Sequence, residues 1–278
     1  MIDTLNTLND AFLNTNFVLV APRMAANVGS AARAIKTMGF SRLILVRPPN
    51  DGFQATFNFK LDHPEAVALA SGAQDVLANT QIVDTLDEAL SACSQSIALT
   101  ARPREWSGPV VQLPQYTVQA AQRMGLERIA YVFGNERFGL SNEDVSRCSA
   151  ICSIDVNPDY SSLNLSQAVQ VVAYSQRIAL MAALNNTRVS TTPILSRELA
   201  SEALANHEQI QGMAQHWLNI LEVADYYDPL QPRRLKERLA SLWGRANLTR
   251  ADVDMLRGMA AALSQPVKNK SVKKVNQF

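Results

Sequence analysis

The feature that most constrains the fold is an alternation of short β-branched runs with helical stretches over the first 180 residues. Six of these runs have the length and composition of buried strands. Strands separated by helices are typical of a parallel sheet that helices cover on both faces, so the predicted fold class is α/β. The predicted strands lie at residues 17–21, 43–46, 81–85, 96–101, 129–134 and 151–156.

Capping signals predict several of the helices between these strands. A helix is expected from Asn27 to Met38, with Asn27 as a possible N-cap and Gly39 as a left-handed stop. Ser141 and Asp144 have the spacing of a capping box. The other expected helices in this part of the chain lie at 64–77, 86–92, 118–124 and 166–184.

Beyond residue 185 the strand patterns cease and only helical periodicity remains. Helices are expected at 197–226, around 235–242 and at 253–263, the last capped by Thr249 with Asp252 three residues on. The predicted organisation is an N-terminal extension (1–16), an α/β domain (17–185), a linker (186–196), a helical extension (197–264) and a disordered basic tail (265–278).

Charge is unevenly distributed along the chain. The formal net charge is +1, but residues 1–228 carry 15 basic and 22 acidic side chains, whereas residues 229–278 carry 11 basic and 3 acidic. An acidic body with a basic end suggests a polyanionic partner that binds near the C-terminus.

Composition also excludes several classes of protein. No apolar run approaches the ~20 residues of a membrane span, so no membrane partner is expected, and the N-terminal segment lacks the pattern of a signal peptide. Three cysteines, an odd number without a close pair, argue against a disulfide framework, and Cys148 and Cys152 are expected to be buried thiols. Three histidines leave little material for a metal site. A cytoplasmic protein is expected.

Ligands of parallel α/β sheets bind at the carboxyl ends of the strands, which directs attention to four loops: 22–30, 99–105, 134–141 and 156–165. None of them contains the G-x-G-x-x-G pattern of common dinucleotide sites.

Taken singly, these loops leave alternatives open. The glycines of loop 134–141 permit close approach of a ligand, but the loop could equally be a solvated turn. Ser162 and Asn164 lie near a helix N-terminus, where they could bind an anion, although a simple N-cap role for Asn164 or Ser166 is favoured. Arg33 could hold a phosphate, yet a surface arginine on an alanine-rich helix is the commoner case.

Taken together, three motifs in these loops resemble those of a known family. They are Asn27-x-Gly29-x-x-x-Arg33, Gly134-Asn135-Glu136-x-x-Gly139-Leu140 and Ser162-Leu163-Asn164-Leu165-Ser166. Their order, each after a predicted strand, resembles motifs 1, 2 and 3 of the SpoU branch of the SPOUT RNA 2′-O-methyltransferases. Segments such as SGAQDV, IVDTLDEAL and LRGMAAALS extend the resemblance over about residues 17–264.

The resemblance implies a SPOUT methyltransferase domain, whose parallel sheet contains a C-terminal trefoil knot, followed by a small helical extension. It also implies a homodimer that uses S-adenosylmethionine, releases S-adenosylhomocysteine and needs no metal. The implied reaction is 2′-O-methylation of tRNA in the anticodon loop, at nucleotide 32, on cytidine or uridine. Transferred position by position, the donor site comprises Leu99, Thr100, Ala101, Gly134, Ile154, Ser161, Ser162 and Leu163.

The resemblance assigns the catalytic set to Arg33, Ser162, Asn164, Asn27 and Glu136. Family proposals sometimes make the arginine a base, but a guanidinium has a pKa above ~12. We therefore expect Arg33 to hold the phosphate beside the target ribose and to stabilise charge on the ribose oxygen. Ser162 and Asn164 would orient the hydroxyl or brace their loop, and Glu136 would order the second motif, for example by pairing with an arginine.

Basic residues outside the pocket are expected to contact the tRNA backbone. Between residues 233 and 250 the chain has six basic side chains and one acidic side chain. The predicted RNA-binding residues are Arg23, Arg33, Arg233, Arg234, Lys236 and Arg238.

Three other functions compete with this interpretation. The first is methylation of a different tRNA or rRNA nucleotide. The second is a non-catalytic RNA-binding protein with the SPOUT fold, which the intact motifs disfavour. The third is a Rossmann-type methyltransferase that places the methyl group on a base nitrogen.

Overall fold

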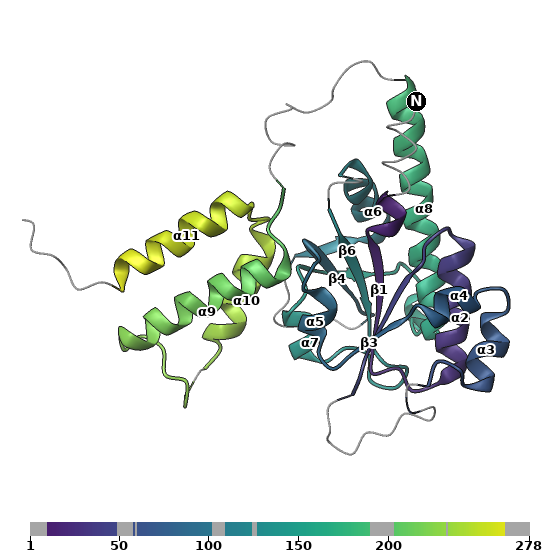
Figure 1. Ribbon diagram of the computed structural model, residues 1–278, viewed down its shortest axis with the longest axis horizontal. Coiled ribbons are helices and arrows are strands. Elements are labelled where there is room, and N and C mark those ends of the chain that lie inside the picture. Colours follow the sequence, from purple (N-terminus) through teal and green to yellow (C-terminus); the bar gives the residue numbers. More distant parts are fainter. Residues whose placement is uncertain are drawn as a thin grey trace, which may run out of the picture.

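The protein contains a seven-stranded parallel sheet, seen in a computed structural model that describes residues 10–48, 58, 60–101, 109–123, 127–189, 203–231 and 233–264 (Figure 1). The strand order is β3-β2-β1-β6-β4-β7-β5. The strands are β1 (Thr15–Val20), β2 (Arg42–Val46), β3 (Gln81–Val83), β4 (Gln95–Leu99), β5 (Val110–Gln112), β6 (Ile129–Phe133) and β7 (Ala150–Ser153).

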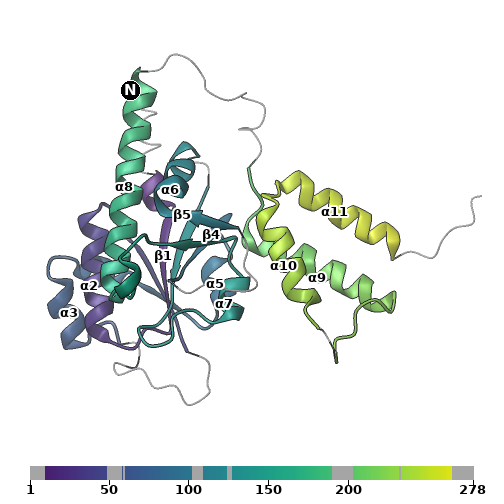
Figure 2. The same ribbon diagram turned by 180° about the vertical axis from the view of Figure 1, so that it is seen from behind.

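Helices cover both faces of the sheet, which confirms the predicted α/β class (Figures 1 and 2). Alternate residues of the central strands face opposite sides: Phe17 and Leu19 pack into one core, and Val18 packs into the other. The first core is covered by α2 (Ala25–Thr37), α3 (Pro64–Ala70), α4 (Gln74–Ala78), α6 (Leu113–Gln122) and α8 (Leu165–Val189). The second is covered by α5 (Leu86–Leu90) and α7 (Asn142–Ser146).

The last three helices form the helical extension that the sequence predicts. They are α9 (His207–Val223), α10 (Leu235–Arg245) and α11 (Arg250–Leu263), and we refer to them as the helical module. Ala205, Met213 and Val253 form the centre of its small core. The module lies beside α5 and α7, away from α2 and α3 (Figures 1 and 2).

Several element boundaries differ from the sequence predictions. The helix expected at 64–77 is two helices, because Ser71 adopts φ +52° and the chain turns there. Strand β5 was not predicted, since it has only three residues at the sheet edge and Val110 is exposed. Helix α6 begins at Leu113, earlier than predicted.

Residues 197–202 of the helix expected at 197–226 lie outside the described residues. The described helix begins at His207, where Asn206 and Gln209 form a capping box that sets its start. The two predicted capping boxes are confirmed, at Ser141 with Asp144 and at Thr249 with Asp252. Gly39 has φ +87°, as expected of a left-handed stop.

The predicted domain boundaries stay predictions. β1 already begins at Thr15, and α8 continues to Val189. The predicted tail at 265–278 lies outside the described residues, and so do residues 190–196 of the predicted linker. The trefoil knot also stays a prediction, because strand order alone does not define how the chain threads.

Candidate active site

The candidate donor-binding residues lie at the carboxyl ends of three adjacent strands, β6, β4 and β7. Leu99 at the end of β4 is level with Phe133 of β6 and Cys152 of β7. The N–H of Thr100 donates to the carbonyl of Cys152 over 3.0 Å, which keeps the edge aligned one residue further. The residues that follow these ends are Ala101, Gly134 and Ile154, and the exposed Ser161, Ser162 and Leu163 follow a short 3-10 turn, η1 (Pro158–Tyr160).

The loop at Gly134–Leu140, which we call the motif-2 loop, is closed by its own polar groups. The Asn135 Oδ1 accepts the N–H groups of Arg137 (3.0 Å) and Phe138 (2.8 Å), and the N–H of Gly139 donates to the Asn135 carbonyl over 3.0 Å. A Cβ on Gly134 would lie 2.0 Å from the Gly139 carbonyl carbon. Glycine at 134 is therefore required by packing inside the loop itself.

Glu136 extends from this loop to the start of α2. Its Oε2 accepts the N–H of Arg23 over 2.8 Å, and its Oε1 accepts the N–H of Met24 over 3.1 Å. Met24, at the N-cap position of α2, provides no side-chain cap, and the first turn contains no acidic residue. The Glu136 carboxylate, from a loop 113 residues beyond Arg23, thus places a negative charge just before the first turn of α2, where the helix dipole favours it.

Asn27 is not the N-cap of α2 that the sequence suggested, because α2 already begins at Ala25. Its buried side chain joins the three motifs instead. The Asn27 Nδ2 donates to Glu136 Oε1 over 2.8 Å, and its Oδ1 accepts from Asn164 Nδ2 over 3.0 Å. A continuous polar junction therefore runs from Glu136 through Asn27 to Asn164.

Of the two N-cap candidates, Asn164 and Ser166, Asn164 takes the N-cap position of α8. Its Oδ1 accepts the N–H of Ser166 over 2.9 Å and the Ser166 hydroxyl over 2.7 Å, at the start of α8. Because its Nδ2 is bound to Asn27, the amide has one fixed orientation. Asn164 therefore braces the third motif against the first.

Arg33 lies on the exposed side of α2, and its guanidinium forms no hydrogen bond or ion pair within the described part of the chain. Gly29, one turn before Arg33 on the same helix, packs closely on α3, since a Cβ on Gly29 would lie 2.1 Å from the Ala66 carbonyl oxygen. The small residues of this helix thus serve backbone packing. They leave Arg33 directed outward and free to meet a phosphate.

The predicted RNA-binding residues near the C-terminus gather at the start of α10. Arg233, Arg234, Lys236 and Arg238 are all exposed. A helix N-terminus is itself electropositive, so these cations add to the dipole instead of neutralising it. The result is a local positive field suited to a polyanion.

The thiols of the three cysteines are not among the candidate site groups. Cys93, Cys148 and Cys152 are buried, as predicted for the last two, and burial raises the pKa of each thiol to about 12. Within the described residues, no group of three or more histidine, cysteine, aspartate or glutamate side chains could hold a metal ion. Nor does that part of the chain contain a helix long and apolar enough to cross a membrane.

Comparison with known proteins places this geometry in a family context. The SpoU rRNA Methylase family matches residues 14–174, and the tRNA methyltransferase TrmJ C-terminal domain matches residues 208–272. The tRNA (cytidine/uridine-2′-O-)-methyltransferase TrmJ of Klebsiella pneumoniae is 36% identical over 257 residues, which cover 92% of this chain and 99% of the relative.

Solved structures show the same likeness. TrmJ from Z. mobilis ZM4 superposes with a TM-score of 0.72 at 30% identity, covering 90% of this chain and 99% of that chain. A probable methyltransferase from Bordetella pertussis is 43% identical, with a TM-score of 0.55, over 62% of this chain and 99% of that chain.

Proposed function

The chain belongs to the SpoU methylase family, and we propose that it methylates the ribose 2′-hydroxyl of nucleotide 32, a cytidine or uridine, in the anticodon loop of tRNA. The methyl donor in this proposal is S-adenosylmethionine, and no metal takes part. Relatives named TrmJ, similar over almost their whole length, support tRNA as the substrate and 2′-O-methylation as the reaction. The observation that carries the proposal is the hydrogen-bonded junction of Glu136, Asn27 and Asn164 beside the strand ends.

The residues at the strand ends fit such a donor. Leu99, Ile154 and Leu163 offer apolar side chains for a purine ring, and backbone groups beside them can read its edge. Gly134 has no side chain, so the backbone can approach a ligand closely there. When bound, the donor supplies a methyl group on a positively charged sulfur.

The reaction is a displacement in which the ribose oxygen forms the new C–O bond and the S–CH₃ bond breaks. The electron pair of that bond remains on sulfur, and the hydroxyl proton passes to water. Arg33 holds the adjacent phosphate and stabilises the negative charge that develops on oxygen. Ser162 orients the hydroxyl, while Asn27, Asn164 and Glu136 keep the loops in position. Correct positioning of this kind can supply several kcal/mol, on the order of 7 or more.

The helical module supplies the contact with the tRNA backbone through the cations at the start of α10. In this proposal Arg23, whose backbone N–H donates to the Glu136 carboxylate, contacts the same RNA nearer the target nucleotide. Each lost phosphate contact should flatten the salt dependence of tRNA binding by about 0.7–0.9 in logarithmic slope. Reversing the charges of Arg234 and Arg238 with no change in affinity or slope would exclude this surface.

The proposal includes a homodimer that acts in the cytoplasm, where tRNA is found. Helix α8 presents Val171, Tyr174 and Ile178 to solvent at helical spacing, and Tyr174 is 54% exposed. An apolar stripe of this kind is typical of a subunit contact. Sedimentation equilibrium of the purified protein, with and without tRNA, tests this part.

The decisive experiment maps methylated nucleotides in tRNA treated with purified protein and donor. A nuclease-resistant dinucleotide at position 32 is the expected result, because 2′-O-methylation blocks cleavage there. A methyl group on a base, or at another nucleotide of tRNA or rRNA, would refute the assignment. The matched variant Arg33→Ala should bind the donor normally and lose methylation. If the wild-type protein binds tRNA but not the donor, it is a non-catalytic binding protein.

A further inference from the structure

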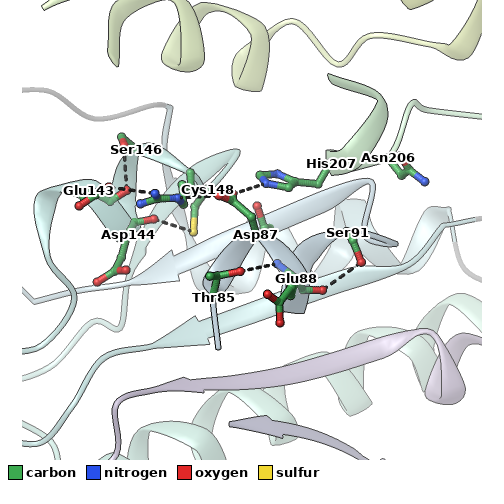
Figure 3. Close-up of polar contacts among 12 residues, drawn as sticks. Thr85, Asp87, Glu88, Ser91, Glu143, Asp144, Ser146, Cys148, Asn206 and His207 are labelled. Atoms are coloured by element: carbon green, nitrogen blue, oxygen red, sulfur yellow. Dashed lines mark hydrogen bonds and ion pairs between the residues drawn. The ribbon is translucent and has the colours of Figure 1, made fainter. Parts of the chain in front are cut away.

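A cluster of charged side chains joins the helical module to the domain that carries the active site. The Asp87 Oδ1 lies 2.8 Å from the His207 Nε2, at the first residue of α9. The Asp87 Oδ2 accepts from the Arg147 Nε over 3.1 Å. Figure 3 shows Asp87 between the helical module and the α7 region, with the His207 ring directed at it. One carboxylate thus joins α5, the C-cap residue of α7 and the start of α9.

Main-chain bonds support this cluster. The N–H of His207 donates to the Cys93 carbonyl over 2.8 Å, and the N–H of Glu208 donates to the Ser91 carbonyl over 3.3 Å. These carbonyls follow the end of α5, so the unsatisfied donors of one helix meet the unsatisfied acceptors of another. The dipoles of α5 and α9 therefore attract each other across the junction.

Two further contacts fix the module at a distance from the cluster. The Gln95 Nε2 donates to the Asn247 Oδ1 over 3.1 Å, just beyond α10. A Cβ on Gly244 would lie 3.5 Å from the Ser149 Cα, so α10 rests directly on the backbone before β7. Contacts from α9, α10 and the turn after α10 define one orientation of the module.

The packing of the helical module on the α/β domain also sets where the cations of α10 lie. Lys236, one of the exposed cations of α10, also lines the cleft between the module and the α/β domain, together with Arg147 and His207. The loop from α9 to α10 lies on the side of the molecule to which the carboxyl ends of the strands point (Figures 1 and 2). The orientation of the module therefore sets the position of these cations relative to Arg33.

We propose that Asp87 and His207 are positioning residues for tRNA, which lock the helical module so that its cations and the catalytic loops engage one RNA at the same time. This inference rests on the proposed function. Two contact sites held at a fixed separation bind one ligand more tightly than the same sites on a loose tether, because the second contact becomes intramolecular. Neither residue needs to touch the RNA.

The test compares Asp87→Asn with Asp84→Asn in the full-length protein. Asp84 lies three residues earlier and pairs with Arg47 on the exposed surface, so the control removes an equal charge outside the junction. We expect Asp87→Asn to raise the Kd for tRNA roughly tenfold, while donor affinity and the rate at saturating tRNA stay unchanged. General loss of folding would alter all three quantities.

A second pair of variants tests docking without touching a charge. In Gly244→Ala the new methyl group makes only an ordinary contact with Ser149, whereas the indole in Gly244→Trp must displace α10. Small-angle scattering of the free protein should show a larger radius of gyration for Gly244→Trp and Asp87→Asn than for the wild-type protein. The controls Gly244→Ala and Asp84→Asn should show the wild-type value. The same two variants should show the weakened tRNA binding.

The outcomes separate the two proposals. A wild-type protein that binds tRNA without methylating it refutes the proposed reaction. The tRNA affinity of Asp87→Asn relative to that of Asp84→Asn then still decides the positioning role. A wild-type protein that methylates tRNA, with unchanged Kd in both Asp87→Asn and Gly244→Trp, overturns the positioning role and leaves the reaction intact.

Discussion

Replacing Glu136 with glutamine tests whether the carboxylate organises the active site. Glu136 accepts three hydrogen bonds, from the N–H groups of Arg23 and Met24 and from the Asn27 amide, over 2.8, 3.1 and 2.8 Å. Glutamine has the same shape but only one acceptor oxygen. If that oxygen replaces Oε1, the amide NH₂ faces the N–H of Arg23, and two donors meet.

The structure sets the size of the effect. Loss of one hydrogen bond to a charged group costs about 1.5–3 kcal/mol. Loss of negative charge at a helix N-terminus adds about 0.3–1 kcal/mol. The two terms describe overlapping interactions, so we expect a total of about 2–3 kcal/mol. For a domain of this size such a loss lowers Tm by about 5–10 °C.

Thermal unfolding followed by circular dichroism measures this loss, with Glu222→Gln as the control because Glu222 is exposed on α9. The control should change stability by less than about 0.5 kcal/mol. A double-mutant cycle of Glu136→Gln with Asn27→Ala should show a coupling of about 1 kcal/mol. The single-turnover methylation rate should also fall, because displaced loops lose the reactive geometry. If Glu136→Gln has the same Tm as the wild-type protein, and the two substitutions have additive effects on the free energy of unfolding, Glu136 does not organise these loops.

Two further predictions concern the motif-2 loop and the junction. Gly134→Ala should lower the free energy of unfolding by about 3 kcal/mol, because the new Cβ would lie 2.0 Å from backbone atoms. Gly139→Ala meets no atom and should lower it by only about 1 kcal/mol, because of the φ of +70°. Equal losses of stability in urea unfolding would contradict this. The hydrogen bond from His207, and then the Arg147 charge, hold the pKa of Asp87 below its ordinary 3.8, so the stability from this carboxylate is complete above that pH and is lost as pH falls through the lowered pKa. Acid titration of the radius of gyration should show this loss, and Asp87→Asn should lack it.

The sheet could be predicted because its strands are runs of apolar and β-branched residues buried on both faces. Phe17, Val18 and Leu19 pack alternately into the two cores, which requires an unbroken apolar run. Strand β5 escaped prediction since Val110–Gln112 pairs only with β7 and needs no such run. The break between α3 and α4 at Ser71 could not be predicted, because the apolar helical pattern continues across the turn and both helices cover the same core.

The loops of the candidate site could be located from the sequence, but the bonds between them could not. Asparagine is a residue type typical of N-caps, so the sequence suggested that role for Asn27. Its role in the structure depends on Glu136 and Asn164, which lie 109 and 137 residues away. One local signal did exist. Helix α2 begins at Ala25, Met24 provides no capping side chain and the first turn has no acidic residue, so a negatively charged group from elsewhere in the chain is expected near this helix N-terminus.

The charge distribution along the chain implies separate roles for its two ends. Charges exposed to solvent act over about 8–10 Å at physiological salt, so the cations of α10 cannot neutralise the phosphate at the reacting nucleotide unless they lie beside it. In the proposed mechanism that task falls to Arg33, an exposed cation in the part of the chain where acidic residues exceed basic ones by 22 to 15. Loss of Arg33 should therefore lower the methylation rate more than tRNA affinity, and loss of the α10 cations should do the reverse. In the proposed arrangement, the docking at Asp87 allows both ends to act on one RNA.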